Sequence, residues 1–273
     1  MKIAQFYEDG RVRLGMIQDE KNLTPIDFQG DMLDFIKTKP DYKPTGRPIP
    51  LNEIAFAPPL TNPPKIIGIG LNYHEHIEEG HEQVPKTPII FSMFTTSLTG
   101  HKTEIRWDPA LTSKVDFEAE LAVIIGKRAY RHPEQGIMDI VYGYTCANDV
   151  SARNLQFGDR QWLRGKSLDT FCPLGPWIVT RDEIPDPHNL EIKSFLNEVL
   201  MQHSNTGRMI FRIPSLLSFI SQSFTLTPGD VILTGTPEGV GALRDPPVYM
   251  KEGDQIVIDI EAIGRLENTC RTL

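Results

Sequence analysis

Cysteine is scarce in this 273-residue sequence. The three cysteines, Cys146, Cys172 and Cys270, are odd in number and contain no Cys-x-x-Cys pair. This excludes a disulfide framework and the common structural zinc patterns. Basic residues are not in excess either, because 36 acidic residues against 28 Lys and Arg give a formal charge of −8. This charge argues against a nucleic-acid partner and against an anionic membrane surface.

Long apolar runs are also lacking. No stretch approaches the roughly 20 apolar residues of a membrane helix, and residues 1–10 lack the apolar core of a signal peptide. With the cysteine usage, this predicts a cytoplasmic protein. An apolar content of 40% and a charged content of 23% are typical of an ordinary globular protein, with length for one large domain or two smaller ones.

Proline divides the chain, since eight prolines lie between positions 40 and 64. Such density disfavours regular structure and predicts a linker or extended arm. Before it, the segments 2–7 and 12–17 are typical of strands around a hairpin turn, and a short helix is expected near 31–37. We therefore predict a small N-terminal domain over 1–60 and a main domain over 61–273.

The main domain is predicted to consist mostly of strands, because β-branched or alternating apolar segments dominate it. Helices are expected only around 73–79, 151–157 and 213–221. Strands and helices do not alternate regularly, which argues against a parallel doubly wound sheet and for a β-rich α+β fold. The predicted strands are 65–69, 88–93, 117–125, 139–147, 177–180, 190–196, 231–234 and 255–260.

The segment 115–126 is the most informative part of the sequence. Read as one strand, it places Asp116, Glu118 and Glu120 on one face, which becomes apolar at Ala122 and Ile124. Carboxylates on a half-buried face repel each other unless a proton or a cation compensates them. The pattern therefore indicates a divalent-metal site. The alternative is a solvated edge strand whose charges block aggregation.

A third acidic candidate, Asp149, ends the apolar strand 141–147. In a helical segment, its spacing to Arg153 and Gln156 would place all three on one face. Asp149 could be a third metal ligand, or simply the N-cap of the following helix.

The segment 72–80 is predicted to form a two-turn helix, with Asn72 and Glu75 at capping-box spacing and Gly80 as its end. His76 and Glu79, three residues apart, could act as a general base and the carboxylate that orients it. The alternative is a hydrophilic surface turn.

Two glycine motifs fail as nucleotide sites. Gly165-Lys166-Ser167 lacks the earlier glycine of a phosphate-binding loop, and Gly68-x-Gly70 lacks the third glycine of a dinucleotide fingerprint. Lys166 is better interpreted as a single cation near the acids, or else as an exposed lysine. The glycine-rich loop 235–241 can present backbone N–H groups to an anion.

Five segments in the same order resemble the fumarylacetoacetate hydrolase family, in its acylpyruvase-like branch, over about 62–270. The N-terminal segment resembles the small domain that often precedes this one. The five segments are Gly70-Leu71-Asn72-Tyr73-x-x-His76-x-x-Glu79, Asp-x-Glu-x-Glu-Leu at 116–121, Asn148-Asp149-Val150-Ser151-Ala152-Arg153, the segment 165–176 that begins Gly165-Lys166-Ser167-x-Asp169, and Thr234-Gly235-Thr236-Pro237-x-Gly239.

The resemblance implies a fumarylacetoacetate hydrolase-type mixed β-sandwich or roll with few helices, assembled as a homodimer. It implies Mg²⁺ or Mn²⁺ bound by Glu118, Glu120 and Asp149, and this all-oxygen set also suits a hard cation on general grounds. The roles it implies for other residues are a His–Glu dyad that activates water, a lysine that meets an enolate, and three substrate contacts. These residues are His76, Glu79, Lys166, Arg153, Gln156 and Thr236.

The sequence departs from the family pattern at one turn. Where the family has Asn-Gly-Glu, this chain has Asn197-Glu198-Val199, with Gln202 following. Losing the glycine removes easy access to a positive φ, so the hairpin geometry and its substrate contact are open questions.

The function expected from the resemblance is metal-dependent hydrolysis of acylpyruvates, which are 2,4-diketo acids such as fumarylpyruvate and acetylpyruvate. Cleavage of the carbon–carbon bond would give a pyruvate enolate, stabilised as it forms. The alternative on the same fold is an oxaloacetate or related 2-oxo acid decarboxylase or isomerase. An alternative of another class is a non-catalytic metal-binding regulator.

Overall fold

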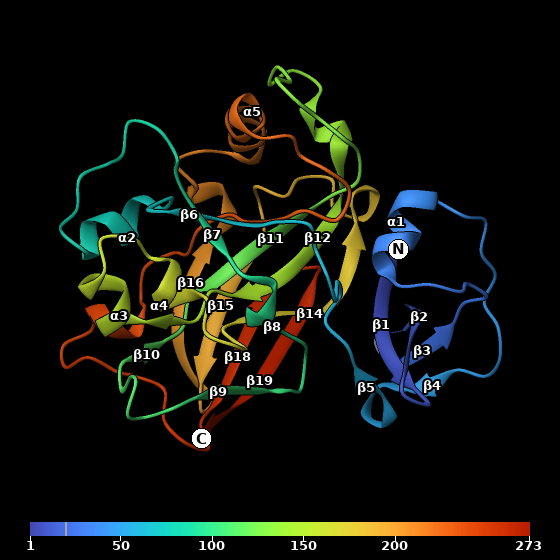
Figure 1. The fold of residues 1–273 in the computed structure, drawn as a ribbon, viewed down its shortest axis with the longest axis horizontal. Helices are drawn as coiled ribbons and strands as arrows, with labels where there is room; N and C mark the ends of the chain where they lie inside the picture. Colours follow the sequence, from blue (N-terminus) through green and yellow to red (C-terminus); the bar gives the residue numbers. More distant parts are fainter. Residues whose placement is uncertain (20) are drawn as a thin grey trace.

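The computed structural model describes residues 1–19 and 21–273. Within them the protein is β-rich with few helices, which confirms the predicted fold class. A long mixed sheet of twelve strands is accompanied by a five-stranded sheet and a two-stranded ribbon. Figure 1 shows the N-terminal elements gathered on one side and the remaining strands and helices on the other.

Ten strands make the path of the long sheet, and two short ones pair beside it. Strand β5 (Ala55–Phe56) pairs with β1, and β8 (Leu98–Thr99) pairs with β14. In spatial order the ten strands are β4 (Ile49–Pro50), β3 (Asn22–Pro25), β2 (Arg11–Ile17), β1 (Lys2–Glu8), β14 (Cys172–Thr180), β12 (Val141–Asn148), β11 (Ala119–Ile125), β17 (Val231–Leu233), β6 (Ile66–Gly70) and β7 (Ile89–Met93).

The smaller sheets frame the site. The ribbon pairs β10 (Val115–Asp116) with β13 (Ser151–Ala152). The five-stranded sheet packs against the middle of the long one, where β14 contacts β19 and β11 contacts β15. Its strands, in order, are β16 (Val199–Asn205), β15 (Glu191–Leu196), β18 (Gln255–Ile260), β19 (Gly264–Thr272) and β9 (Glu104–Trp107).

Strand β11 separates the two hydrophobic cores of the protein. Leu121 and Val123 point into the core that the five-stranded sheet closes, whereas Ala122 and Ile124 point into the core shared with the N-terminal strands. A strand buried on both faces has no polar side, which explains the apolar end of the acidic segment.

The acidic segment is not one strand, however. Pairing stops between Asp116 and Ala119, so Phe117 and Glu118 lie in a break. There the Glu118 N–H donates to the side chain of Asn148 at 3.0 Å instead of to a backbone carbonyl of a neighbouring strand. The prediction of a continuous strand was wrong at this point, because β10 pairs with β13 and β11 with β12.

The N-terminal hairpin is confirmed, with its turn at Asp9 (φ 50°) and Gly10 (φ 72°), the positive angles of a type I′ turn. Strand β1 also pairs with β14, so the N-terminal strands extend the main sheet. Short strands β4 and β5 form in the proline-rich stretch, where none was predicted. Strand β4 is at the sheet edge, where Pro50 removes no central ladder bond. The domain boundary near residue 60 stays a prediction.

The predicted helices are confirmed within about two residues, and α4 was not predicted. No helix of the described chain is long and apolar enough to cross a membrane. The helices are α1 (Met32–Thr38), α2 (His74–Glu79), α3 (Arg153–Gly158), α4 (Leu163–Lys166) and α5 (Ile213–Ser223), with 3₁₀ turns η1 (Leu51–Glu53), η2 (Thr95–Ser97), η3 (Ile137–Ile140), η4 (Arg181–Glu183), η5 (Thr206–Arg208) and η6 (Gly241–Leu243).

Candidate active site

Three carboxylates meet where β11 begins and β12 ends. Glu118, Glu120 and Asp149 each offer an oxygen, and these oxygens lie within 4.8 Å of one another. All three side chains are buried, so the solvated edge strand considered from the sequence is excluded. The structure therefore brings together the three residues predicted as metal ligands.

Lys166 from α4 enters the same cluster, although a lysine is rarely this buried. Its ammonium group donates to Glu118 Oε2 (2.9 Å), Asp149 Oδ2 (2.6 Å) and Ser151 Oγ (2.9 Å). Burial opposes its charged form, but Asp149 and Glu118 outweigh burial and raise the pKa of Lys166. Lys166 is therefore a fixed cation, and the exposed-lysine alternative is wrong.

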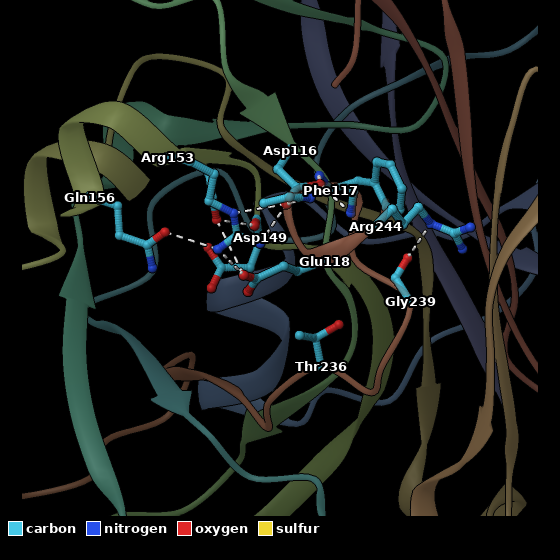
Figure 2. Close-up of polar contacts among 12 residues, drawn as sticks. Asp116, Phe117, Glu118, Asp149, Arg153, Gln156, Thr236, Gly239 and Arg244 are labelled. Carbon is cyan, nitrogen blue, oxygen red and sulfur yellow. Dashed lines mark hydrogen bonds and ion pairs between the residues drawn. The ribbon is translucent and has the colours of Figure 1, made fainter. Parts of the chain in front are cut away.

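Arg153 provides the second positive charge of the cluster (Figure 2). Its guanidinium lies 2.7 Å from Glu118 Oε1 and 2.7 Å from Asp116 Oδ2, and it also donates to Gln156 Oε1 at 2.9 Å. Arg153 thus joins the break in the acidic segment to helix α3.

The cluster carries more negative than positive charge. Four buried carboxylates (Asp116, Glu118, Glu120 and Asp149) face two cations (Arg153 and Lys166), which leaves two negative charges uncompensated. Burial, followed by the charges of Asp149 and Glu118, raises the pKa of Glu120 well above its usual range. Burial also raises the pKa of Asp149 to about 7, despite Lys166. Without another cation, the cluster must bind protons.

These residues fit a divalent metal ion. Asp149 Oδ1 is buried and has no hydrogen-bond partner among the described residues, so one oxygen of the cluster is still unused. A charge of +2 would offset the two uncompensated negative charges, and carboxylate oxygens are the donors that hard cations prefer. The buried Glu–Glu–Asp cluster could therefore hold a divalent metal.

Asp149 is not a helix cap. Helix α3 begins at Arg153, its N-cap position is Ala152, and Asp149 lies before β13 with its side chain turned to Lys166. The N-cap alternative is therefore wrong.

The glycine-rich loop presents backbone N–H groups to anions, as its sequence indicated, and the anions are the protein's own carboxylates. The N–H of Gly235 donates to Glu120 at 2.7 Å, and that of Gly241 donates to Asp116 at 2.8 Å. Gly239 donates to both oxygens of Glu79, each at 3.1 Å. The loop therefore orients carboxylates from three separate segments.

His76 and Glu79 lie on α2, with His76 Nδ1 3.4 Å from Glu79 Oε2. The His76 side chain is 12% exposed and faces a cavity, which excludes the surface-turn alternative. The predicted capping box is wrong, because α2 has no side-chain cap at its N-terminus. The Asn72 side chain bonds instead to the backbone of Phe211 and Thr234, and Glu75 pairs with Arg208.

The cavity has a volume of about 210 Å³ and joins most of the predicted site residues. Glu79 and Asp149 lie behind its wall, each in contact with a residue that lines it. The roles of the individual residues stay predictions. The lining residues are Ile69, Gly70, Leu71, His76, Gly80, Glu82, Phe91, Glu118, Glu120, Arg153, Gln156, Phe157, Trp162, Lys166, Thr236, Ala242 and Leu243.

Two structurally important residues were not among the predicted site residues. Asp116 accepts hydrogen bonds from Arg153, Gly241 and Ala242, and so fixes both the arginine and the loop. Its place in the Asp-x-Glu-x-Glu pattern was the available signal. Ser151 accepts a bond from Lys166, and no sequence pattern indicated that role.

The unusual turn of β15 and β16 keeps its hairpin geometry without glycine. Asn197 has φ 49° and Glu198 φ 67°, so both adopt the left-handed conformation. Gln202 reaches the site from this hairpin and donates to Thr236 Oγ1 at 2.8 Å. Gln202 therefore reaches the site although this turn has no glycine.

Comparisons with known proteins agree with this geometry. The family model described as "Fumarylacetoacetate (FAA) hydrolase C-terminal" matches residues 65–271. The chain belongs to the fumarylacetoacetate hydrolase family. The oxaloacetate tautomerase Fahd2a, mitochondrial, of Rattus norvegicus is 47% identical over 221 residues, which cover 81% of this chain and 70% of the relative.

Two solved structures share the whole fold. A fumarylacetoacetate hydrolase from Exiguobacterium antarcticum has a TM-score of 0.91 and 34% identity, with 100% of both chains covered. A 5-carboxymethyl-2-hydroxymuconate delta-isomerase from Mycobacterium smegmatis has a TM-score of 0.85, 34% identity and the same coverage. Because such relatives are named as enzymes, this chain is an enzyme of the family, and the regulator alternative is not favoured.

One expectation is overturned by these names. We expected a cytoplasmic protein, but relatives from Rattus norvegicus, Bos taurus and Homo sapiens are named as mitochondrial proteins. The composition of residues 1–10 and the few cysteines do not determine the compartment. The homodimer implied by the resemblance stays a prediction.

Proposed function

We propose that this protein interconverts the enol and keto forms of oxaloacetate. The observation that carries the proposal is a single small cavity that joins a histidine, a buried lysine and a carboxylate cluster. Its volume of about 210 Å³ lies below the roughly 300–1,000 Å³ of pockets for drug-sized ligands, and so suits a small 2-oxo acid. Relatives named oxaloacetate tautomerases support this substrate.

Glu118, Glu120 and Asp149 would hold Mg²⁺ or Mn²⁺, since all three are oxygen donors. Once bound there, such a metal supplies Lewis-acid stabilisation of negative charge on the 2-oxo oxygen. Two uncharged donors in the wall could bind the substrate carboxylates. Gln156 uses its oxygen on Arg153, which leaves its NH₂ group, and Thr236 accepts from Gln202, which leaves its hydroxyl proton.

His76 is the proposed base. When Nδ1–H donates to Glu79, the lone pair on Nε2 is available on the other side of the ring. In the direction of enol formation, Nε2 removes a proton from C3, and the C–H electron pair forms the C2=C3 bond. The C2=O pair moves onto oxygen, which then takes the proton back from the imidazolium, so no co-reactant is consumed.

Lys166 would stabilise the charge on that oxygen. Its three N–H donors already point to Glu118, Asp149 and Ser151, which fixes the ammonium before substrate binds. A cation held in place in a water-poor site lowers the energy of an enolate without reorganisation. Because its pKa is raised, Lys166 acts as a cation rather than as a base.

Hydrolysis of acylpyruvates is the second candidate, and the His76–Glu79 pair favours it. An imidazole oriented by a carboxylate is the arrangement needed to deprotonate water. The same enolate would result from carbon–carbon cleavage, and also from decarboxylation of oxaloacetate, for which no attacking water is required.

The test is to follow the ultraviolet absorbance of enol oxaloacetate with purified protein and Mg²⁺ or Mn²⁺, and again with chelator. Acetylpyruvate cleavage and carbon dioxide release are measured in parallel. We expect His76→Ala to slow tautomerisation by about 10²–10⁴-fold, the usual contribution of a general acid–base group. His74→Ala is the matched control, because His74 is an exposed histidine on the same helix.

Four results would decide against the proposal or against its base. If enol oxaloacetate decays no faster with the protein than in buffer alone, the protein has no tautomerase activity. Faster cleavage of acetylpyruvate would favour the hydrolase, and release of carbon dioxide at the rate of enol loss would favour the decarboxylase. Equal activity of the His76→Ala and His74→Ala proteins would exclude His76 as the base.

A further inference from the structure

The motif Gly68-x-Gly70, which failed as a nucleotide fingerprint, has another use in the structure. Both glycines lie on β6, two residues apart and therefore on one face of the strand. A Cβ atom at Gly68 would overlap the ring of Phe91, and one at Gly70 would overlap the ring of Trp162. Because neither glycine has a side chain, the rings of Phe91 and Trp162 can lie directly over β6 at these two positions.

These two rings form a continuous wall, which we call the aromatic wall (Phe91 and Trp162). Their centroids are 5.4 Å apart at an interplanar angle of 68°, an edge-to-face arrangement. Both residues line the cavity. Phe91 lies on β7, whereas Trp162 lies directly before α4.

The aromatic wall adjoins the reacting end of the site. Lys166 Nζ, the atom that donates to Glu118 and Asp149, lies 5.1 Å from the centroid of the Phe91 ring. A 2-oxo acid whose oxygen lies near the Lys166 ammonium also lies near the Phe91 ring, so the aromatic wall is available to a substituent on its C3.

Oxaloacetate has no apolar group to offer to this wall. The wall also offers no unshared positive charge to a second carboxylate, because Arg153 and Lys166, the Arg and Lys among the described cavity-lining residues, are each shared between two buried acids. Glu82, an exposed acid beside Gly80, also lines the cavity and adds no positive charge to it. An uncharged aromatic substituent fits this side of the cavity better than a second carboxylate does.

We propose that the cavity also accepts 2-oxo acids with an aryl group on C3, of which phenylpyruvate is the simplest, and interconverts their enol and keto forms. This inference rests on the proposed tautomerase chemistry and names a further substrate class for it. The reaction is an isomerisation: the enol O–H proton leaves, its electron pair forms the C2=O bond, and C3 takes up one proton.

The experiment measures enol–keto conversion of phenylpyruvate and of oxaloacetate by the wild-type protein with Mg²⁺. It is repeated with Trp162→Ala and with Trp162→Leu, which keeps an apolar side chain if the alanine protein folds poorly. Phe94→Ala is the matched control, since the Phe94 ring is exposed outside the cavity. Titration calorimetry with phenylpyruvate and with pyruvate gives the affinities independently of turnover.

We expect the wild type to act on phenylpyruvate and to bind it more tightly than pyruvate. Trp162→Ala should lower kcat/KM for phenylpyruvate about tenfold more than for oxaloacetate, as loss of one aromatic contact predicts. The Phe94→Ala protein should keep both activities. Turnover of oxaloacetate but not of phenylpyruvate would overturn this inference and leave the tautomerase proposal intact. Equal losses of activity on both substrates in the Trp162 variants would do the same. Absence of both activities would instead refute the tautomerase proposal itself.

Discussion

Adding a divalent metal should raise the thermal stability of this protein, because the folded state alone assembles the carboxylate cluster. Glu118, Glu120 and Asp149 come from the break before β11, from β11 and from the end of β12, so the unfolded chain has no such site. A ligand that binds only the folded state at about 100 times its Kd stabilises it by about 2.7 kcal/mol. For a domain of this size, that corresponds to a rise in Tm of roughly 5–10 °C.

The assay is thermal unfolding of chelator-treated protein at increasing Mg²⁺ or Mn²⁺. The shift should saturate, as expected for one site, and should be lost in Asp149→Asn, which removes one charge and keeps the volume. Asp139→Asn is the matched control, because that carboxylate is 70% exposed and pairs with Arg181 at the surface. Both variants lose one negative charge, so a general effect of net charge is excluded.

The charge argument also predicts how the variant behaves without metal. Since two negative charges of the cluster are uncompensated, Asp149→Asn should unfold at the same or a higher temperature than the wild type in chelator. Equal metal shifts in both variants, or none in the wild type, would refute the reasoning that the buried acids form a divalent-metal site.

Three further predictions concern stability. Glu198→Gly should raise the free energy of unfolding in urea by about 1 kcal/mol, since Glu198 has φ 67°, and an unchanged value would show that the turn is not strained. Tyr73→Phe should not destabilise the protein, because the buried hydroxyl has no partner among the described residues, and a loss above about 1 kcal/mol would reveal one. Burial, aided by Lys102, lowers the pKa of His101 from 6.5 to about 4. Below pH 6.5 only the unfolded chain binds this proton, so about 2 kcal/mol should be lost between pH 7.5 and pH 5, and His101→Asn should lose less.

Local patterns in the sequence were sufficient to predict the acidic site. The period-2 spacing of Glu118 and Glu120 survives the strand break, because both residues still turn toward Asp149. The break itself could not be predicted, since it depends on β10 pairing with β13, which lies more than thirty residues away along the chain. The two capping predictions failed for a similar reason. Asn72 bonds to Phe211 and Thr234, and Asp149 bonds to Lys166, through contacts that only the folded chain creates.

Other parts of the sequence have patterns that do not indicate the structure or role observed. The Gly68-x-Gly70 pair has the spacing of part of a dinucleotide fingerprint, whereas its glycines make room for aromatic rings. Strands β16 and β19 were not predicted, because a buried polar residue, Gln202 or Asn268, replaces an apolar one in their alternation. The identity of Lys166 as a buried cation depends on α4, a four-residue helix too short to be seen in a periodic pattern.

The loop after β17 explains why the site requires glycine at defined positions. Gly235 (φ 98°) and Gly239 (φ 94°) have positive φ angles that other residues rarely adopt. In this conformation Gly235 donates to Glu120 and Gly239 to Glu79, so one loop orients a metal-ligand candidate and the carboxylate behind His76. A side chain at Gly239 would also overlap the backbone of Met201. Because the same short segment fixes both groups, displacement of the loop should impair metal binding and base orientation together.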